Sequence, residues 1–174
     1  MPNWIVNILN VYSDSEESSR ELVEFLKQHL HKRDYDKEVV TFFDFNTVIP
    51  APDKSLEYVP LNKRLNGPQP NIAWRRKNWN TKWNSDSNIH YDYESILNGA
   101  TKISGEIQLV FRTAWNPPLP VIKELILMHP ELNISCDYYS LESMIAGCIA
   151  KDFFDEEQII HESWDLKNYN KEII

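Results

Sequence analysis

The stretch that decides the fold is EIQLVFRTAWNPPLPVIKELILMHPELNISCDY, residues 106–138. Apolar and polar residues alternate from Glu106 to Thr113, which predicts a strand with one buried face. A proline-rich turn then leads into residues 118–129, whose apolar residues recur at helical spacing and which end at His129-Pro130. Alternation resumes from Leu132 to Tyr138 and predicts a second strand. The order strand, helix, strand indicates a β-α-β unit.

The sequence on either side extends this pattern. Residues 4–12 (WIVNILNVY) predict an N-terminal strand, residues 15–32 an amphipathic helix, and residues 39–49 a further extended segment. Two more strands are expected over residues 144–150 and 158–164. We therefore expect a single α+β domain over residues 1–174: a ferredoxin-like split β-α-β sandwich, with a largely antiparallel sheet and both main helices on one face.

Composition excludes several classes of protein. The chain has 174 residues, 42% of them hydrophobic and 25% charged, which is ordinary for one globular domain. It contains no run of eighteen apolar residues and no basic, apolar N-terminal leader. Two cysteines, Cys136 and Cys148, are too few for a disulfide scaffold and lack zinc-ligand spacing, so we expect free, largely buried thiols. A cytoplasmic location is expected by elimination.

Charge is distributed unevenly along the chain. The net charge is −8, but residues 58–85 contain six Lys or Arg and no Asp or Glu, so the remainder carries −14. Three of the six tryptophans lie in the same segment. Residues 58–90 are therefore expected to form an irregular, basic, Trp-rich insertion whose indoles pack inward and whose cations point outward.

Four short motifs, in order, resemble the YubB-type ferredoxin-like family of phage and plasmid proteins. They are Met1-Pro2-Asn3-Trp4, the segment from Phe43 to Pro52, the loop Asn78–Asn84, and the segment from Phe111 to Pro118. The chain departs from the family pattern at Ile5, Asn80 and Asn84, where the family has Cys, Gly and Asp, and in having fewer acidic residues over 138–142. The resemblance implies the ferredoxin-like fold, a mobile-element origin and a bacterial host cytoplasm. It implies no activity.

No catalytic or cofactor motif is recognisable. The five histidines are scattered, and a single His-x-Ser at His161 lacks the second copy that a two-histidine phosphoesterase needs. Neither a P-loop nor a dinucleotide-binding fingerprint occurs, and the acidic run over residues 152–157 lacks calcium-loop spacing. We therefore expect no catalytic residue, no metal and no cofactor.

Two segments combine indoles with polar and cationic groups. Two indoles four residues apart, beside Lys, Asn and Thr, suit stacking on a planar ligand, whereas Arg side chains suit a phosphate. The alternative is that the tryptophans only anchor the insertion to the sheet. The candidate binding residues are Trp79, Asn80, Thr81, Lys82, Trp83, Arg112, Trp115, Arg75 and Arg76.

These observations favour a non-enzymatic accessory protein of a phage or mobile element. It would bind a host protein or other macromolecule, or a small ligand, and counter-defence is one role that fits. The alternatives are a protein that binds or processes a nucleotide-like molecule, and a nucleic-acid-binding module, which the acidic remainder of the chain disfavours. No membrane association is expected, and the sequence leaves the oligomeric state open.

Overall fold

The computed structural model describes residues 3–14, 18–35, 38–52, 72–86, 105–152 and 158–169. Within these ranges a five-stranded antiparallel sheet has the order β4-β1-β5-β6-β7. Its strands are β1 (Trp4–Tyr12), β4 (Glu106–Ala114), β5 (Asn133–Ser140), β6 (Ile145–Lys151) and β7 (Ile159–Asp165). A separate hairpin pairs β2 (Leu30–Tyr35) with β3 (Glu38–Phe43). The helical elements are α1 (Ser18–His29), η1 (Phe45–Thr47), α3 (Ile72–Asn78), α5 (Leu119–Met128) and α6 (Leu166–Tyr169).

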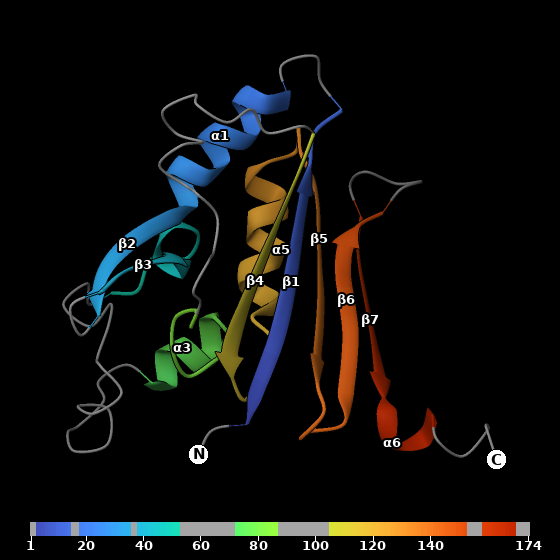
Figure 1. Ribbon diagram of the computed structural model, residues 1–174. Coiled ribbons are helices and arrows are strands. Elements are labelled where there is room, and N and C mark those ends of the chain that lie inside the picture. Colours follow the sequence, from blue (N-terminus) through green and yellow to red (C-terminus); the bar gives the residue numbers. More distant parts are fainter. Residues whose placement is uncertain are drawn as a thin grey trace.

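The β4-α5-β5 segment forms the expected split β-α-β unit (Figure 1). Strand β1 lies between β4 and β5 and is antiparallel to both, so β4 and β5 are parallel to each other. The hairpins β5-β6 and β6-β7 then extend the sheet on one side. On the other side the backbone of Asp86 pairs with that of Arg112 on β4, through two hydrogen bonds of 2.9 Å.

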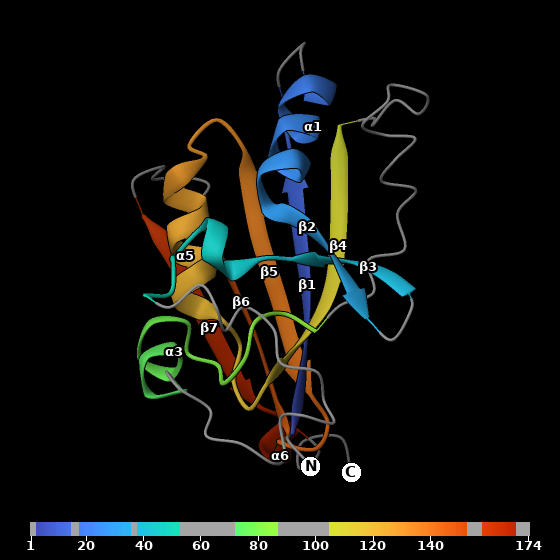
Figure 2. The ribbon, with the colours of Figure 1, turned by 90° about the vertical axis from the view of Figure 1, so that its left-hand side faces the viewer.

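Both main helices lie on the same face of the sheet, as predicted (Figure 2). Their apolar stripes include Leu22 and Leu26 of α1 and Ile122 and Ile126 of α5, all at most 3% exposed. They pack with the odd-numbered residues of β1 and β4, such as Leu9 and Leu109, into one core. The alternation within each strand therefore separates a covered face from an open face.

Two predicted boundaries are wrong. Helix α1 ends at His29 instead of continuing to residue 32, because Leu30 begins a strand that pairs with β3. The extended segment predicted over residues 39–49 stops at Phe43, where the Asp44 side chain accepts a hydrogen bond from the Asn46 backbone N–H and caps η1. Local capping at Asp44 thus overrides the β-branched composition that follows it.

The insertion is not irregular where it is described. Residues 72–78 form α3, and residues 79–85 form a turn that contacts the end of β3, η1 and the end of β4. Residues 58–71 and 87–90, together with a short helix that the sequence suggests over residues 91–97, lie outside the described residues.

Candidate functional site

The turn after α3 is held by side-chain hydrogen bonds. Asn80 has a φ of +62° and donates through Nδ2 to the Pro117 carbonyl at 2.9 Å. Asn tolerates this left-handed conformation better than other non-glycine residues, which explains Asn at the family's glycine position. The Thr81 hydroxyl donates to the Ala114 carbonyl at 3.1 Å. Both residues therefore fix the turn against the end of β4.

Trp79 belongs to the core. Its side chain is 0% exposed, and its indole N–H donates to the Ile49 carbonyl at 2.8 Å. Phe45 packs edge-on against it, with ring centroids 5.7 Å apart. Of the two alternatives for this residue, anchoring is the one that its geometry supports.

The expectation that the insertion's cations all point outward is wrong for Arg75. This residue is 7% exposed, and its guanidinium lies over the Trp79 indole, 5.4 Å from the ring centroid. A guanidinium is weakly hydrated and planar, so it stacks on an aromatic face at a lower desolvation cost than an ammonium group. Arg76, one position on, is exposed.

The other candidates meet at the end of the sheet where β1 begins and β4 ends. Lys82 lies 4.7 Å from the centroid of the Trp83 ring, which contacts the Trp4 ring at 6.1 Å. The Arg112 guanidinium lies over the Trp4 ring, 5.0 Å from its centroid. We call this group the Trp–cation surface, comprising Trp4, Arg76, Lys82, Trp83, Arg112 and Trp115.

Trp115 completes this surface in an unusual backbone conformation. Its φ is +82°, its indole is 49% exposed, and Arg76 lies 6.0 Å from its centroid. The Trp115 N–H donates to the Asn3 carbonyl at 2.9 Å, which holds it beside Trp4. A left-handed conformation costs a non-glycine residue about 1–2 kcal/mol, and such strain is often found at functional positions.

Trp4 is the member that sequence analysis missed. The signal was present, because Trp4 alternates with Val6 and Ile8 on the face of β1 opposite the core residues. Its register opposite Ala114 brings it beside Trp115, and this pairing depends on residues more than a hundred positions apart. Only the structure supplies that register.

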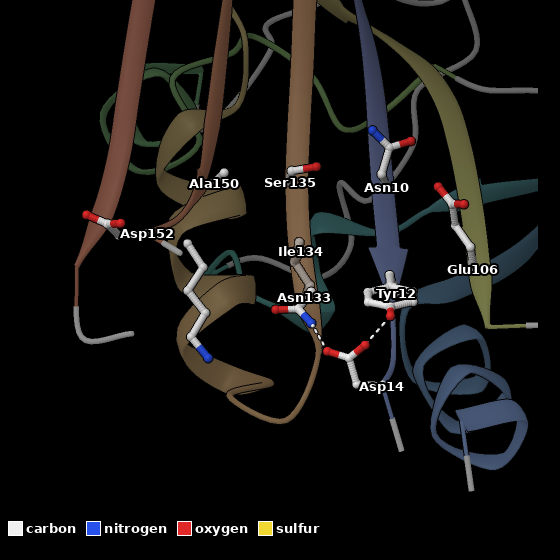
Figure 3. A pocket seen from close by; sticks show the side chains of 10 residues that line it. Asn10, Tyr12, Asp14, Glu106, Asn133, Ile134, Ser135, Ala150 and Asp152 are labelled. Carbon is white, nitrogen blue, oxygen red and sulfur yellow. Dashed lines mark hydrogen bonds between the residues drawn. The ribbon is translucent and has the colours of Figure 1, made fainter. Parts of the chain in front are cut away.

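A hollow of about 740 Å³ lies at the opposite end of the open face (Figure 3). Asn10, Ser135 and Glu106 reach it from three adjacent strands, with α5 behind the strands. Asp14 accepts hydrogen bonds from the Tyr12 hydroxyl and from Asn133 Nδ2. Three carboxylates, of Asp14, Glu106 and Asp152, line the hollow with one cation, Lys151, so this end is acidic, in contrast with the Trp–cation surface.

Two buried histidines form a second polar group that the sequence did not reveal. The Nε2 atoms of His29 and His129 are 2.7 Å apart, and His29 Nδ1 is 2.8 Å from the Thr47 hydroxyl oxygen. The Thr47 hydroxyl donates to the Asp44 carbonyl, so His29 must donate at Nδ1 and accept from His129 at Nε2. Burial, and then the neighbouring His129, lower the pKa of His29 to about 3. His29 is thus a neutral, satisfied core histidine.

The described residues were also compared with the requirements of a metal site and of a reactive thiol. No group of three or more His, Cys, Asp or Glu residues there is placed to hold a metal ion. Both cysteines are free thiols; Cys136 is buried as expected, whereas Cys148 lies on the open face and is only partly buried. Burial raises the pKa of both thiols, which disfavours the nucleophilic thiolate. No described helix is long and apolar enough to cross a membrane.

Comparison with known proteins gives one match. Residues 78–173, more than half of the chain, match the family described as a ferredoxin-like domain in Api92-like protein. No curated protein and no solved structure matches the chain. The matched residues begin at Asn78, the last residue of α3, and include β4, α5 and the three strands that follow.

Proposed function

The chain belongs to the family with a ferredoxin-like domain found in Api92-like proteins, and on that premise we propose that it is a non-enzymatic binding protein. Its partner is an acidic protein, which it captures through the Trp–cation surface. The resemblance to phage and plasmid proteins supports a mobile-element accessory protein that acts on a host protein in the bacterial cytoplasm. The observation that carries the proposal is the placement of three cations over three surface indoles.

The composition of this surface supports protein binding. Tryptophan and arginine are the residues most enriched among energetically dominant interface positions. An indole face under each cation restricts the cation's motion and leaves its N–H donors at the edge, so less entropy is lost when a carboxylate binds. Arg112 already pairs with Asp86 at 3.0 Å while remaining 53% exposed, which illustrates the anion that suits this site.

The same geometry favours a protein with several carboxylates as the partner, in preference to a single nucleotide. A cation already lies over one face of each of the Trp4, Trp83 and Trp115 rings, which leaves a stacking base only the opposite face. The three cations also lie over three different rings. Several carboxylates on one partner would match them better. The binding experiment therefore also includes a nucleotide and a single-stranded nucleic acid as competing ligands.

Fluorescence anisotropy tests the proposal with three labelled probes: a decaglutamate peptide, ATP and a twelve-residue oligothymidylate. The peptide should bind best, and binding should weaken as salt rises, because exposed charges are screened. Arg76→Glu and Trp115→Ala should each weaken peptide binding about tenfold, the effect of losing one interface anchor worth about 1.4 kcal/mol.

Lys123→Glu is the matched control, since Lys123 is an exposed cation on α5, on the covered side of the sheet. It should leave peptide binding unchanged apart from the small effect of net charge. The proposal fails if the peptide does not bind, if Lys123→Glu weakens binding as much as Arg76→Glu, or if ATP or oligothymidylate binds more tightly than the peptide.

A further inference from the structure

The open face of the sheet carries apolar side chains that no described element covers. Val110 of β4 is 48% exposed, Tyr139 of β5 is 40% exposed, and Ile160 and Trp164 of β7 are each 40% exposed. Partly buried Val6 and Ile8 lie between them on β1. An apolar patch across a sheet face usually marks an interaction site.

The strand register arranges this face in rows that cross the sheet. One row runs Arg112, Val6, Tyr139, Ala146 and Trp164, from β4 to β7. The row at the other end of the strands contains Glu106, Tyr12 and Asn133. Arg112 and Glu106 are six residues apart on β4, so about 20 Å separates the cation from the acidic hollow.

Because Arg112 and Glu106 lie at opposite ends of β4, the open face of one copy is complementary in charge to the open face of a second, inverted copy. Two sheets packed face to face are related by a two-fold axis that lies between them, either along the strands or across them. An axis across the strands places Arg112 of each copy opposite Glu106 of the other, on the same strand. An axis along the strands instead places Asp137 opposite Asp137, which costs energy when two carboxylates are desolvated together.

On β5 and β6 the rows near the crossing axis also fit this arrangement, whereas on the β7 edge Glu162 faces Ile160. Asp137 of one copy faces Ser135 of the other, whose hydroxyl is a hydrogen-bond donor, and Cys148 faces Ala150. Five strands spaced about 4.8 Å apart and eight residues long give a face of about 650 Å². Two such faces bury about 1,300 Å², which lies within the range of specific protein interfaces.

We infer that the open face docks onto a second copy of this chain, with the strands of the two copies antiparallel and Arg112 of each opposite Glu106 of the other. This pairing goes beyond capture of an acidic partner. It uses Glu106 and Val110, which lie outside the Trp–cation surface, and shares only its Trp4 and Arg112 edge.

Sedimentation velocity over a range of protein concentrations tests the inference. Wild type should form dimers at micromolar concentration. Glu106→Arg should shift dissociation at least about tenfold toward monomer, because like charges then oppose. The double variant Glu106→Arg with Arg112→Glu restores opposite charges in both contacts and should recover the dimer. A double variant that stays monomeric would contradict the proposed orientation.

Val110→Asp should also give monomers, since it replaces an apolar side chain of the interface, on the β4 edge of the sheet, with a carboxylate. Leu127→Asp is its matched control: Leu127 is 56% exposed on α5, away from the open face, and this variant should remain dimeric. Circular dichroism checks that each variant is folded. A monomeric wild type, or a Val110→Asp variant that dimerises as wild type does, would overturn the inference.

A short bismaleimide gives a second readout. Cys148 is partly exposed near the crossing axis in both copies, whereas Cys136 is buried on the covered face. Cross-linking should therefore yield a covalent dimer that Cys148→Ser abolishes. Because Glu106→Arg and Val110→Asp leave Arg76 and Trp115 untouched, loss of the dimer with peptide binding retained would separate this inference from the proposed function.

Discussion

The covered and open faces of the sheet use alternate residues of the same strands for different purposes. On β1, Leu9 and Val11 are 0% exposed beneath the helices, whereas Trp4 and Val6 on the other face are only partly buried. The covered face is determined by packing with α1 and α5. The open face has Arg112 at one end, Glu106 at the other, and exposed apolar side chains mixed with Asp137 and Glu162 between them, an arrangement that packing within the chain does not require. The difference indicates that folding dictates the residues of the covered face and leaves the open face available for the proposed binding.

Replacing one buried and one exposed indole should give the largest difference in the free energy of unfolding. Trp79→Ala should lower the free energy of unfolding by about 3–5 kcal/mol, since it removes a fully buried ring. Trp115→Ala should change it by less than about 1 kcal/mol and should weaken peptide binding instead. Chemical denaturation measures both. Equal losses for the two variants would remove the distinction between an anchoring and a binding indole.

Aliphatic truncation on the helices tests the covered face itself. Leu26→Ala and Ile126→Ala should each cost about 2–5 kcal/mol, because both side chains are at most 3% exposed. Leu127→Ala, on the exposed side of α5, should cost less than about 1 kcal/mol. A small loss at Leu26 or Ile126 would mean that the helices do not cover the sheet as described.

The buried histidine pair should make the covered face sensitive to acid. Folded His29 has its pKa lowered to about 3, whereas the unfolded side chain binds a proton near its usual pKa of 6.5. Stability should therefore fall as pH drops below about 6.5, by up to about 1.4 kcal/mol per pH unit from this residue. Denaturation at several pH values should show a shallower dependence for His29→Gln.

Thr47→Val provides the control, because it removes the hydrogen bond to His29 and keeps the imidazole. It should lower stability at every pH yet retain the wild-type slope between pH 6.5 and the acid range. If His29→Gln retains that slope too, proton uptake at His29 does not govern the acid response.

The smallest effect on stability is expected at the exposed cation. Arg76→Glu should leave the free energy of unfolding within about 0.5 kcal/mol of wild type, as surface substitutions usually do. Arg75→Glu should be clearly destabilising, since the guanidinium is buried over Trp79. Thermal unfolding compares these neighbours directly, and a destabilising Arg76→Glu would place this side chain in the fold and not in the binding surface.

The sequence predicted the elements whose periodicity is regular. Every strand from β4 onward, and α5, lies within two residues of its predicted bounds, because alternation and helical spacing are local properties. The end of α1 escaped prediction because it depends on the pairing of β2 with β3. The cap at Asp44 is local, to the backbone of Asn46, and was missed because the surrounding aromatic and β-branched residues predict a continuous strand. For the candidate site, indole and cation content pointed to the segment that supplies Lys82, Trp83 and Arg76 of the Trp–cation surface. It did not separate Trp79 and Arg75, which are buried, from Trp83 and Arg76.

The most direct test of the account follows the six indole N–H signals in a ¹H–¹⁵N spectrum while the decaglutamate peptide is added. Trp4, Trp83 and Trp115 should shift with peptide concentration, whereas buried Trp79, whose N–H is bound to the Ile49 carbonyl, should not. Trp74, packed against Trp79, and Trp164, at the β7 edge, should also stay in place. Shifts confined to Trp164, or unchanged signals from Trp4, Trp83 and Trp115 at saturating peptide, would contradict the claim that the Trp–cation surface is the binding site.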